Sequence, residues 1–410
     1  MTVCGMSLIF GNIKDYSKRI LWLPELMLKL IFMWPEKNTI QLTSTFIFWG
    51  FLNMFVLWGQ ITYSYMNYKD YNKSLTVVSS MSTLFQSTLK MLMLTYHAAP
   101  LREILSNIST KFWPCRILPD HLEEYKSSYR NGLGAMLSLT CSGMFFSVAS
   151  LVVPLLSANR ELPFRSLYPF DCSVSPIYEM IYILHCFINA YLVNWAVLGF
   201  DFLFMGICRN IVSQYTLLQK AFLQLGTEKE KYLNKKLRSL NIDLIVNGNL
   251  QANGNSTLLV KLIQLHQLLL KTTKNVENVF NLMAACQLCS SIVAICVSGF
   301  ISTRENVSKV QVITMTSYLV GHLIQLYLYC ATGNELLYVS NNLTQQIFAS
   351  NWYEIEDVNV QKDIIFVIKN AQIPAKITAF KVFTLNYATY IKVLRLSFSF
   401  YTLLSSMINK

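Results

Sequence analysis

Residues 278–303 read NVFNLMAACQLCSSIVAICVSGFIST and contain no Asp, Glu, Lys or Arg. A helix of about 20 apolar residues is long enough to cross the hydrocarbon core of a bilayer. Uncharged stretches of comparable length lie at 38–68, 131–159, 180–200 and 310–334, and 74–101 is interrupted only by Lys90. The sequence therefore predicts an all-α membrane protein in which these six stretches are spanning helices.

The composition excludes an ordinary soluble protein. Hydrophobic residues make up 53% of the 410 residues, charged residues make up 14%, and the mean hydropathy is +0.38. Soluble proteins carry about 25% charged residues. The ten cysteines are scattered, and Cys286 and Cys289 form a CxxC inside an apolar stretch. This arrangement predicts packed thiols rather than a disulfide framework, and no metal or cofactor is expected.

Residues 386–410, NYATYIKVLRLSFSFYTLLSSMINK, predict a seventh spanning helix of a different kind, because hydroxyl side chains are mixed with large apolar ones. At three- and four-residue spacing, one stripe contains Leu396, Ser399, Leu403, Ser406 and Met407. Hydroxyls on such a stripe can hydrate ions, and a ring of large apolar side chains from several subunits can close a pore by dewetting. The alternative is that the serines only allow close helix packing.

The distribution of basic residues predicts the orientation, because cytoplasmic loops are enriched in Lys and Arg. With seven crossings, 23 of the 34 basic residues fall on the side of the N-terminus, seven on the other side and four within spans. The N-terminus is therefore expected in the cytosol and the C-terminus outside. The net charge of +12 is assigned to contact with anionic lipid and not to nucleic acid, because the basic residues form no patch interleaved with aromatics.

This orientation divides the chain into four predicted parts. They are a cytosolic N-terminal segment, 1–37, whose apolar residues lie along the membrane; helices one to six, 38–334, with a long cytosolic loop at 209–275; a cytosolic anchor segment, 335–380; and a pore-lining helix, 381–410. The inner ends of helices four to seven are expected to pack as one cytosolic bundle. Residues 158–176, with three prolines and three aromatics, predict a structured outside loop.

Three other classes of membrane protein are disfavoured by the sequence. A G-protein-coupled receptor has its N-terminus outside, and the DRY and NPxxY patterns are absent. A membrane enzyme would need a motif such as HxxxxD or HExxH, and the five histidines are dispersed instead. A transporter would more often show an inverted repeat with broken helices, and the sequence shows none.

Four stretches resemble the insect odorant receptor family, and the resemblance extends over nearly the whole chain. They are QLYLYCATGNELLYVSNNLTQQIFASNWYEI (325–355), FTLNYATYIKVLRLSFSFYTLL (383–404), LPFRSLYPFD (162–171) and GFDFLFMGICRNIVSQYTLL (199–218). In the sister gustatory family, a Gln-Phe pair usually follows the Thr-Tyr of the last helix. Here Thr389 and Tyr390 are followed by IKVLRLSF, which favours the odorant branch. The loop before helix five is shorter than in the co-receptor of the family, which favours a tuning subunit.

The resemblance implies an odorant-gated, non-selective cation channel subunit. Such a subunit would assemble with the odorant co-receptor in a heterotetramer, bind a volatile small molecule in its outer half, and contact membrane lipid and permeating cations. It would be a multi-pass protein of the plasma membrane in olfactory sensory neuron dendrites. A gustatory-type chemosensory channel or a seven-helix receptor of another class stays open as the alternative.

The resemblance also places the ligand among the outer halves of helices 74–97, 132–157, 176–225 and 310–332. Candidate ligand-binding residues there are Val78, Met81, Ser82, Phe85, Phe146, Ser147, Ser150, Tyr178, Ile181, Tyr182, His185, Thr314, Ser317 and Tyr318. For each aromatic residue the alternative is ordinary helix packing. His185 and His322 are ionisable residues inside predicted spans, where such residues are often functional, and His185 is favoured because it lies in the outer half. Asp201 is expected to be a structural partner in the cytosolic bundle.

Overall fold

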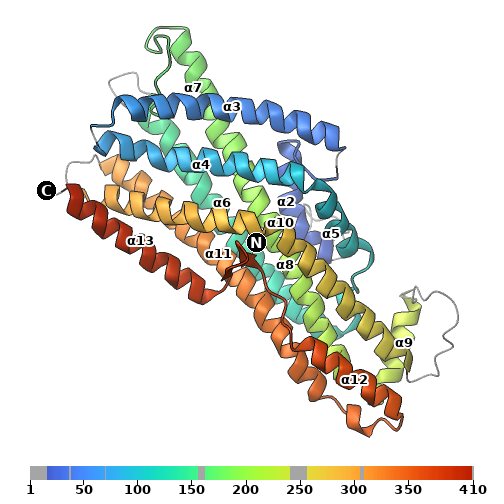
Figure 1. The fold of residues 1–410 in the computed structure, drawn as a ribbon. Coiled ribbons are helices and arrows are strands. Elements are labelled where there is room, and N and C mark those ends of the chain that lie inside the picture. Colours follow the sequence, from blue (N-terminus) through green and yellow to red (C-terminus); the bar gives the residue numbers. More distant parts are fainter. Residues whose placement is uncertain are drawn as a thin grey trace, which may run out of the picture.

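The computed structural model describes residues 16–36, 38–69, 71–155, 162–240, 256–304 and 309–408. Within these residues the chain is helical apart from turns, loops and one two-stranded sheet. Figure 1 shows a broad bundle, here called the body, that narrows into a stem at one end. The stem consists of α9 (Lys229–Ser239), α12 (Val358–Ala371) and the adjoining ends of α8, α10 and α11.

All seven predicted helices are present in the described residues. They are α3 (Thr39–Met66), α4 (Tyr71–Tyr96), α6 (Pro119–Leu155), the continuous run of α7 (Ile177–Phe187), η2 (Ile188–Val193) and α8 (Asn194–Phe222), α10 (Ser256–Ser302), α11 (Lys309–Phe348) and α13 (Tyr387–Ile408). Four segments within them are long and apolar enough to cross a membrane by composition alone: Thr39–Met66, His121–Ala149, Ile177–Phe222 and Leu258–Ser302. The other three helices, α4, α11 and α13, pack directly against these.

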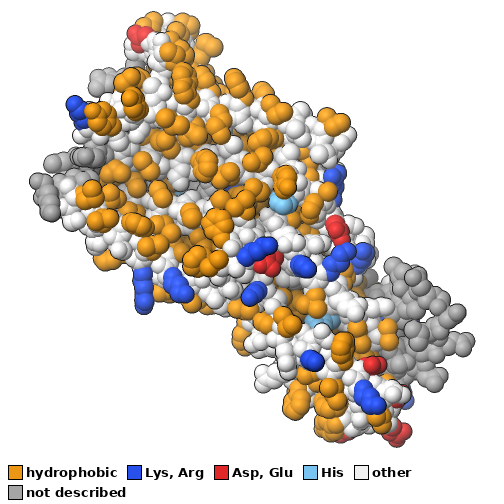
Figure 2. Space-filling view, viewed as in Figure 1, with side chains coloured by type: hydrophobic (Ala, Val, Ile, Leu, Met, Phe, Trp, Pro, Cys, Tyr) orange, Lys and Arg blue, Asp and Glu red, His pale blue; other side chains and the backbone are white. Residues whose placement is uncertain are grey.

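The surface of the body is suited to lipid. Large apolar side chains point away from the protein along α3, where Phe51 is 70% exposed and Ile47 and Phe48 are also exposed. Figure 2 shows hydrophobic side chains over the body, whereas most Lys and Arg side chains in view lie on the stem and at its boundary with the body. An exposed apolar surface of this extent marks a membrane or protein contact.

Helix α8 lies at the centre of the fold and packs against α2, α6, α10 and α11. Helix α2 (Tyr16–Leu30) fits against it where α8 carries glycines. A Cβ atom on Gly199 would lie 3.0 Å from Leu28, and one on Gly206 would lie 2.9 Å from Leu21. The described part of the N-terminal segment is therefore part of the folded core.

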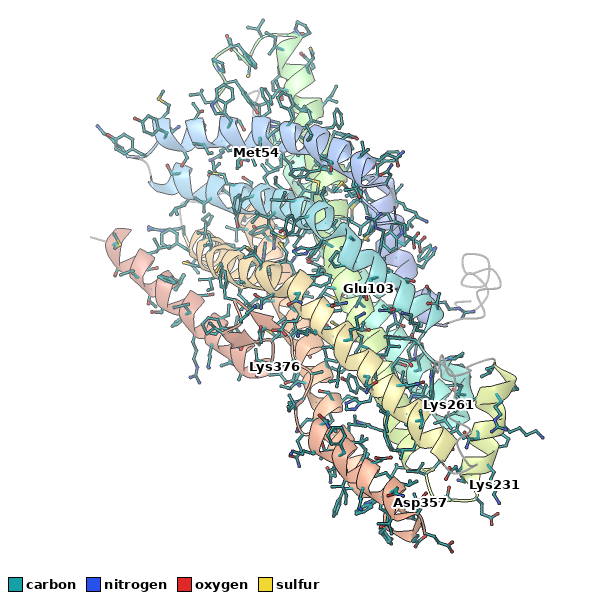
Figure 3. The ribbon with its side chains drawn as sticks, turned by 45° about the vertical axis from the view of Figure 1, so that its right-hand side comes forward. Met54, Glu103, Lys231, Lys261, Asp357 and Lys376 are labelled. Carbon is teal, nitrogen blue, oxygen red and sulfur yellow. The ribbon has the colours of Figure 1, made fainter. Side chains whose placement is uncertain are left out.

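Most of the segment predicted as an anchor, 335–380, lies in the stem. Helix α11 continues into it as far as Phe348, and η3 (Trp352–Glu354) and α12 follow. In Figure 3, Lys231 on α9 and Asp357 before α12 lie at the far end of the stem, and Met54 on α3 lies in the body. The remaining short helices, α5 (Ala98–Thr110) and η1 (Cys115–Ile117), connect α4 to α6.

The last helix begins later than expected, at Tyr387 instead of residue 381. The preceding residues form a hairpin in which β1 (Thr378–Ala379) pairs antiparallel with β2 (Phe383–Thr384). Phe380 and Lys381 turn the chain with positive φ angles of 53° and 58°, a conformation that interrupts helix. The Asn386 side chain then accepts a hydrogen bond from the Thr389 amide at 2.9 Å, which satisfies a free N–H at the helix start.

Candidate functional site

A cavity of about 80 Å³ lies between α4, α6, η2, α8 and α11 in the body. Its wall combines apolar and polar side chains: Thr83, Gln86, Leu139, Ser142, Gly143, Phe146, Ser147, Asn189, Val193, Asn194, Val197, Leu198, Ser317, Tyr318, Gly321, His322 and Gln325. An apolar cavity with a few polar groups is the usual form of a small-molecule site. An engineered cavity that holds benzene measures about 150 Å³, so a ligand of that size requires the wall to move outward.

Four of the predicted ligand-binding residues meet in this wall, namely Phe146, Ser147, Ser317 and Tyr318. The rings of Phe146 on α6 and Tyr318 on α11 lie 5.0 Å apart. The Asn194 amide on α8 donates to the Ser147 hydroxyl at 2.6 Å. Three helices are thus connected across the cavity by residues that belong to its wall.

The other predicted ligand-binding residues lie outside this wall. Val78 packs against a cluster that includes Phe300 and Met315, and Thr314 is buried nearby. Met81 and Ser82 are partly exposed and Phe85 is 53% exposed. Tyr178, Ile181 and Tyr182 lie on α7, where the Tyr182 hydroxyl donates to the Leu151 carbonyl at 2.5 Å. The side chain of Ser150 lies outside the described set.

His185 also lies outside the wall, where it holds the loop that precedes α7. Its Nε2 atom is 2.9 Å from the Tyr168 hydroxyl, and the Tyr168 ring stacks on Phe55 of α3 with a centroid distance of 5.0 Å. Burial raises the pKa of Tyr168 to about 12, so the hydroxyl keeps its proton. The Leu167 amide donates to the Gly59 carbonyl at 2.9 Å. The loop is therefore structured, and α3 and α7 both hold it.

Tyr318 is fixed in the cavity wall by hydrogen bonds to α4. Its hydroxyl donates to the Ser79 carbonyl at 2.9 Å and lies 2.8 Å from the Thr83 hydroxyl. One face of the cavity thus has a defined geometry before any ligand enters.

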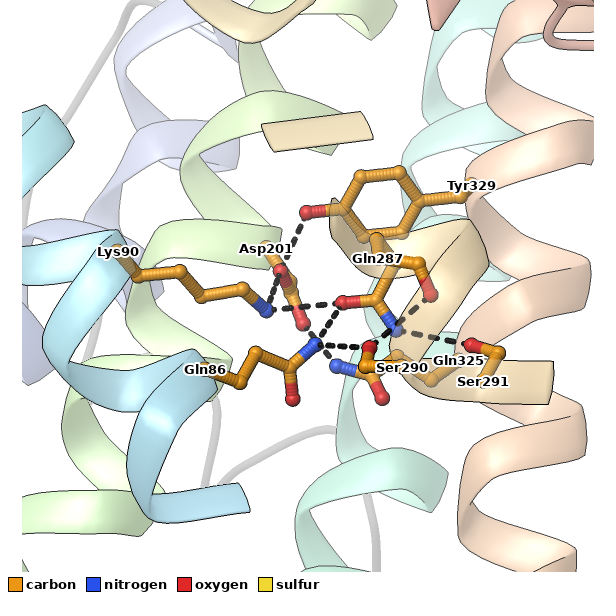
Figure 4. A network of polar contacts seen from close by, with 8 residues as sticks. All are labelled: Gln86, Lys90, Asp201, Gln287, Ser290, Ser291, Gln325 and Tyr329. Atoms are coloured by element: carbon orange, nitrogen blue, oxygen red, sulfur yellow. Dashed lines mark hydrogen bonds and ion pairs between the residues drawn. The ribbon is translucent and has the colours of Figure 1, made fainter. Parts of the chain in front are cut away.

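A buried ion pair lies next to the cavity (Figure 4). Lys90 Nζ on α4 lies 2.5 Å from Asp201 Oδ1 on α8, and both side chains are fully buried. The Tyr329 hydroxyl donates to Asp201 Oδ1 and the Gln325 amide donates to Oδ2, each at 2.5 Å. Lys90 also donates to Gln287 Oε1 at 3.1 Å. Charged groups inside a membrane protein persist when they are paired in this way.

Two glutamines connect this network to the cavity. Gln86 donates to Gln287 and, at 3.3 Å, to Ser290, and Gln86 and Gln325 both line the cavity. Sequence reasoning missed both glutamines, although Lys90 was a signal because it is the single charged residue in 74–101. It also placed Asp201 in the cytosolic bundle, whereas its partner Lys90 lies on α4 of the body.

Helix α13 has one face on the body and one face free in the single chain. Val393 and Ser397 are buried, and Tyr401 and Leu404 pack against a cluster of α10 and α11 residues. The five predicted pore residues, Leu396, Ser399, Leu403, Ser406 and Met407, are all exposed, and Met407 is 66% exposed. A stripe of hydroxyls and large apolar side chains is therefore left without a partner among the described residues.

A profile of the family described as 7tm Odorant receptor matches residues 70–398. The chain belongs to the 7tm odorant receptor family. Odorant receptor Or1 of Anopheles gambiae is similar, with 23% identity over 408 residues, 94% of this chain and 95% of that protein. Odorant receptor 13a of Drosophila melanogaster is 25% identical over 331 residues, 75% of this chain and 73% of its own. Members of this family bind odorants, and these relatives are receptors rather than enzymes.

The fold of an odorant receptor is confirmed by solved structures. The olfactory receptor OR5 of Machilis hrabei in complex with eugenol superimposes with a TM-score of 0.78 at 17% identity, covering 96% of this chain and 98% of that chain. The same receptor without eugenol gives a TM-score of 0.76 at 18% identity, covering 95% and 97%. The chain is thus a membrane protein with the seven-helix fold of this family.

Proposed function

We propose that this chain is a tuning subunit of an odorant-gated, non-selective cation channel. It binds a volatile small molecule in the cavity between α4, α6, α8 and α11, and it forms a heterotetramer with the odorant co-receptor in the plasma membrane of olfactory sensory neuron dendrites. Its N-terminus and stem lie in the cytosol, and its C-terminus lies outside. The last helices of the four subunits, α13 in this chain, line one central pore.

The observation that carries this proposal is the free face of α13. Leu403 and Met407 are more than half exposed in the single chain, on a helix whose opposite face packs against α10. Ser399 and Ser406 lie exposed on the same side. Hydroxyls beside large apolar residues suit a surface that meets water and neighbouring subunits, where apolar rings gate by dewetting. The cavity supports the ligand-binding part of the proposal, because odorants are small and largely apolar.

The channel is tested by odorant-evoked current in oocytes that express this chain, the co-receptor, or both, across a panel of volatiles. The proposal expects a cation current that requires both subunits. A current from this chain alone would contradict the partner assignment. No evoked current with both subunits at the cell surface, while a co-receptor agonist still opens channels, would contradict the odorant-gated function.

The pore assignment has its own test on two serines of one helix. Ser399 is exposed and Ser397 is 1% exposed. A water-soluble thiol reagent should reduce the evoked current of Ser399→Cys beyond its effect on the unmodified complex. Ser397→Cys is the matched control and should respond like the unmodified complex. Equal modification of both variants, or of neither, would place α13 away from the pore.

A further inference from the structure

Two polar side chains in the cavity wall have no hydrogen-bond partner among the described residues. They are Ser142 on α6 and His322 on α11, and the Nδ1 atom of His322 is buried. The other polar side chains of the wall all have partners. For example, Gln325 donates to Asp201 and the Ser317 hydroxyl donates to the Thr314 carbonyl at 2.7 Å. Ser142 and His322 are thus the two side chains of the wall that make no hydrogen bond to another described residue.

His322 is the less expected of the two, because it is only 6% exposed. Nearly all buried polar groups in folded proteins are hydrogen-bonded, and an exception calls for a specific explanation such as a functional role. Hydrocarbon lipid cannot satisfy the imidazole, since it has neither donors nor acceptors. A partner for His322 must therefore come from within the cavity that it lines.

The two groups are held in place on opposite helices. The His322 ring packs edge-on against Tyr318, with centroids 4.5 Å apart and an interplanar angle of 62°, and Tyr318 is fixed to α4 by its hydrogen bonds. Ser142 faces the neighbouring residue of α11, since a Cβ atom on Gly321 would lie 3.2 Å from the Ser142 hydroxyl. Both side chains thus already face the cavity before a ligand enters, which lowers the cost of ordering them on binding.

Building on the proposed odorant-binding function, we propose that His322 and Ser142 form the polar recognition point of the cavity and set its ligand class. That class is a small volatile with an apolar body and one oxygen that forms hydrogen bonds, such as an alcohol, aldehyde or ketone. A neutral imidazole has one donor and one acceptor nitrogen, and a serine hydroxyl both donates and accepts. An alcohol bridges the two groups, and a carbonyl accepts from either. A hydrocarbon of the same shape leaves both unpartnered.

The test compares ligands that share a carbon skeleton: 1-hexanol and 2-hexanone with hexane, and benzyl alcohol with toluene. Binding to the purified full chain in detergent is measured by the rise in melting temperature with ligand concentration, which reports affinity without requiring a channel. One hydrogen bond that only the oxygenated ligand forms predicts about five- to tenfold tighter binding than its hydrocarbon partner.

The variants separate recognition from general damage. Ser142→Ala and His322→Leu should each remove most of the preference for oxygen while changing hydrocarbon affinity by less than about twofold. His322→Gln, whose amide both donates and accepts, should retain the preference. Ser138→Ala is the control, because this exposed serine lies one turn away on α6 outside the cavity. If His322→Leu does not fold, Ser142→Ala and His322→Gln still decide the question.

The outcomes distinguish this inference from the channel proposal. Equal affinity for an oxygenated ligand and its hydrocarbon partner would overturn the recognition point even if odorants evoke current. So would a Ser142→Ala variant that loses affinity for both kinds of ligand to the same extent. A preference for oxygenated ligands that depends on Ser142 and His322, without any evoked current in oocytes, would support the recognition point and overturn the channel proposal.

Discussion

Replacing either partner of the Lys90–Asp201 ion pair should destabilise the protein more than replacing both. Both side chains are fully buried, and Asp201 accepts hydrogen bonds from Lys90, Tyr329 and Gln325. In Lys90→Met a buried carboxylate keeps only neutral donors, and in Asp201→Asn a buried ammonium loses its counterion. Breaking a buried pair from one side costs about 3–5 kcal/mol. At about 2 °C per kcal/mol, the lower end of the range for large domains, each single variant should melt about 6–10 °C lower.

The measurement is the melting temperature of the full chain in one detergent, for both single variants and for Lys90→Met/Asp201→Asn. The double variant has no uncompensated charge and should melt well above the value expected from adding the two losses. The control is Lys271→Met, which removes an exposed ion pair with Glu103, worth about 1 kcal/mol or less. Additive losses in the double variant, or single variants that melt like the Lys271→Met control, would refute the argument.

Three further substitutions test other parts of the fold. Gly59→Ala places a Cβ atom 2.7 Å from the Tyr168 ring, so the loop before α7 should become sensitive to limited proteolysis while the wild-type loop resists it. Gly333→Ala brings its Cβ atom to 2.5 Å from the Leu385 carbonyl oxygen. It should lower the evoked current while ligand-induced stabilisation persists, whereas a loss of both would indicate global damage. Leu403→Ser makes the proposed apolar ring polar and should raise the holding current without odorant, and an unchanged holding current would exclude Leu403 from the gate.

The number and order of the helices could be predicted because hydropathy is a local property of the chain. A stretch such as 278–303 is too apolar and too long to lie outside a membrane or a large core, whatever surrounds it. The start of α13 could not be predicted in the same way. The turn at Phe380 and Lys381 depends on the pairing of Thr378 with Thr384. The periodicity of apolar residues does not reveal a pairing between two such short strands.

The candidate site was only partly predictable, because a spanning helix is apolar on every side and its periodicity does not tell which side faces a cavity. The residues expected at the site came from the outer parts of four helices. Those that line the cavity, such as Phe146 on α6 and Tyr318 on α11, are the ones whose side chains meet between these two helices. The two intramembrane histidines show why the sequence alone could not identify the cavity residues. His185 and His322 look alike in sequence, yet a hydroxyl from a loop 17 residues away in the chain is bound to one of them.

Helix α11 is the element that relates the cavity to the last helix. Within 15 residues, about 22 Å at 1.5 Å per residue, it contributes Tyr318 and His322 to the cavity, Tyr329 to the ion pair, and Gly333 to the contact with Leu385 just before α13. A single helix transmits a displacement along its axis because its hydrogen-bonded turns are stiff compared with the packing around it. The proposed function therefore expects a ligand that pushes the cavity wall outward at α11 to act also on the hairpin that precedes α13. The hydrogen bonds from Gln325 and Tyr329 of α11 to Asp201 of α8 oppose that movement.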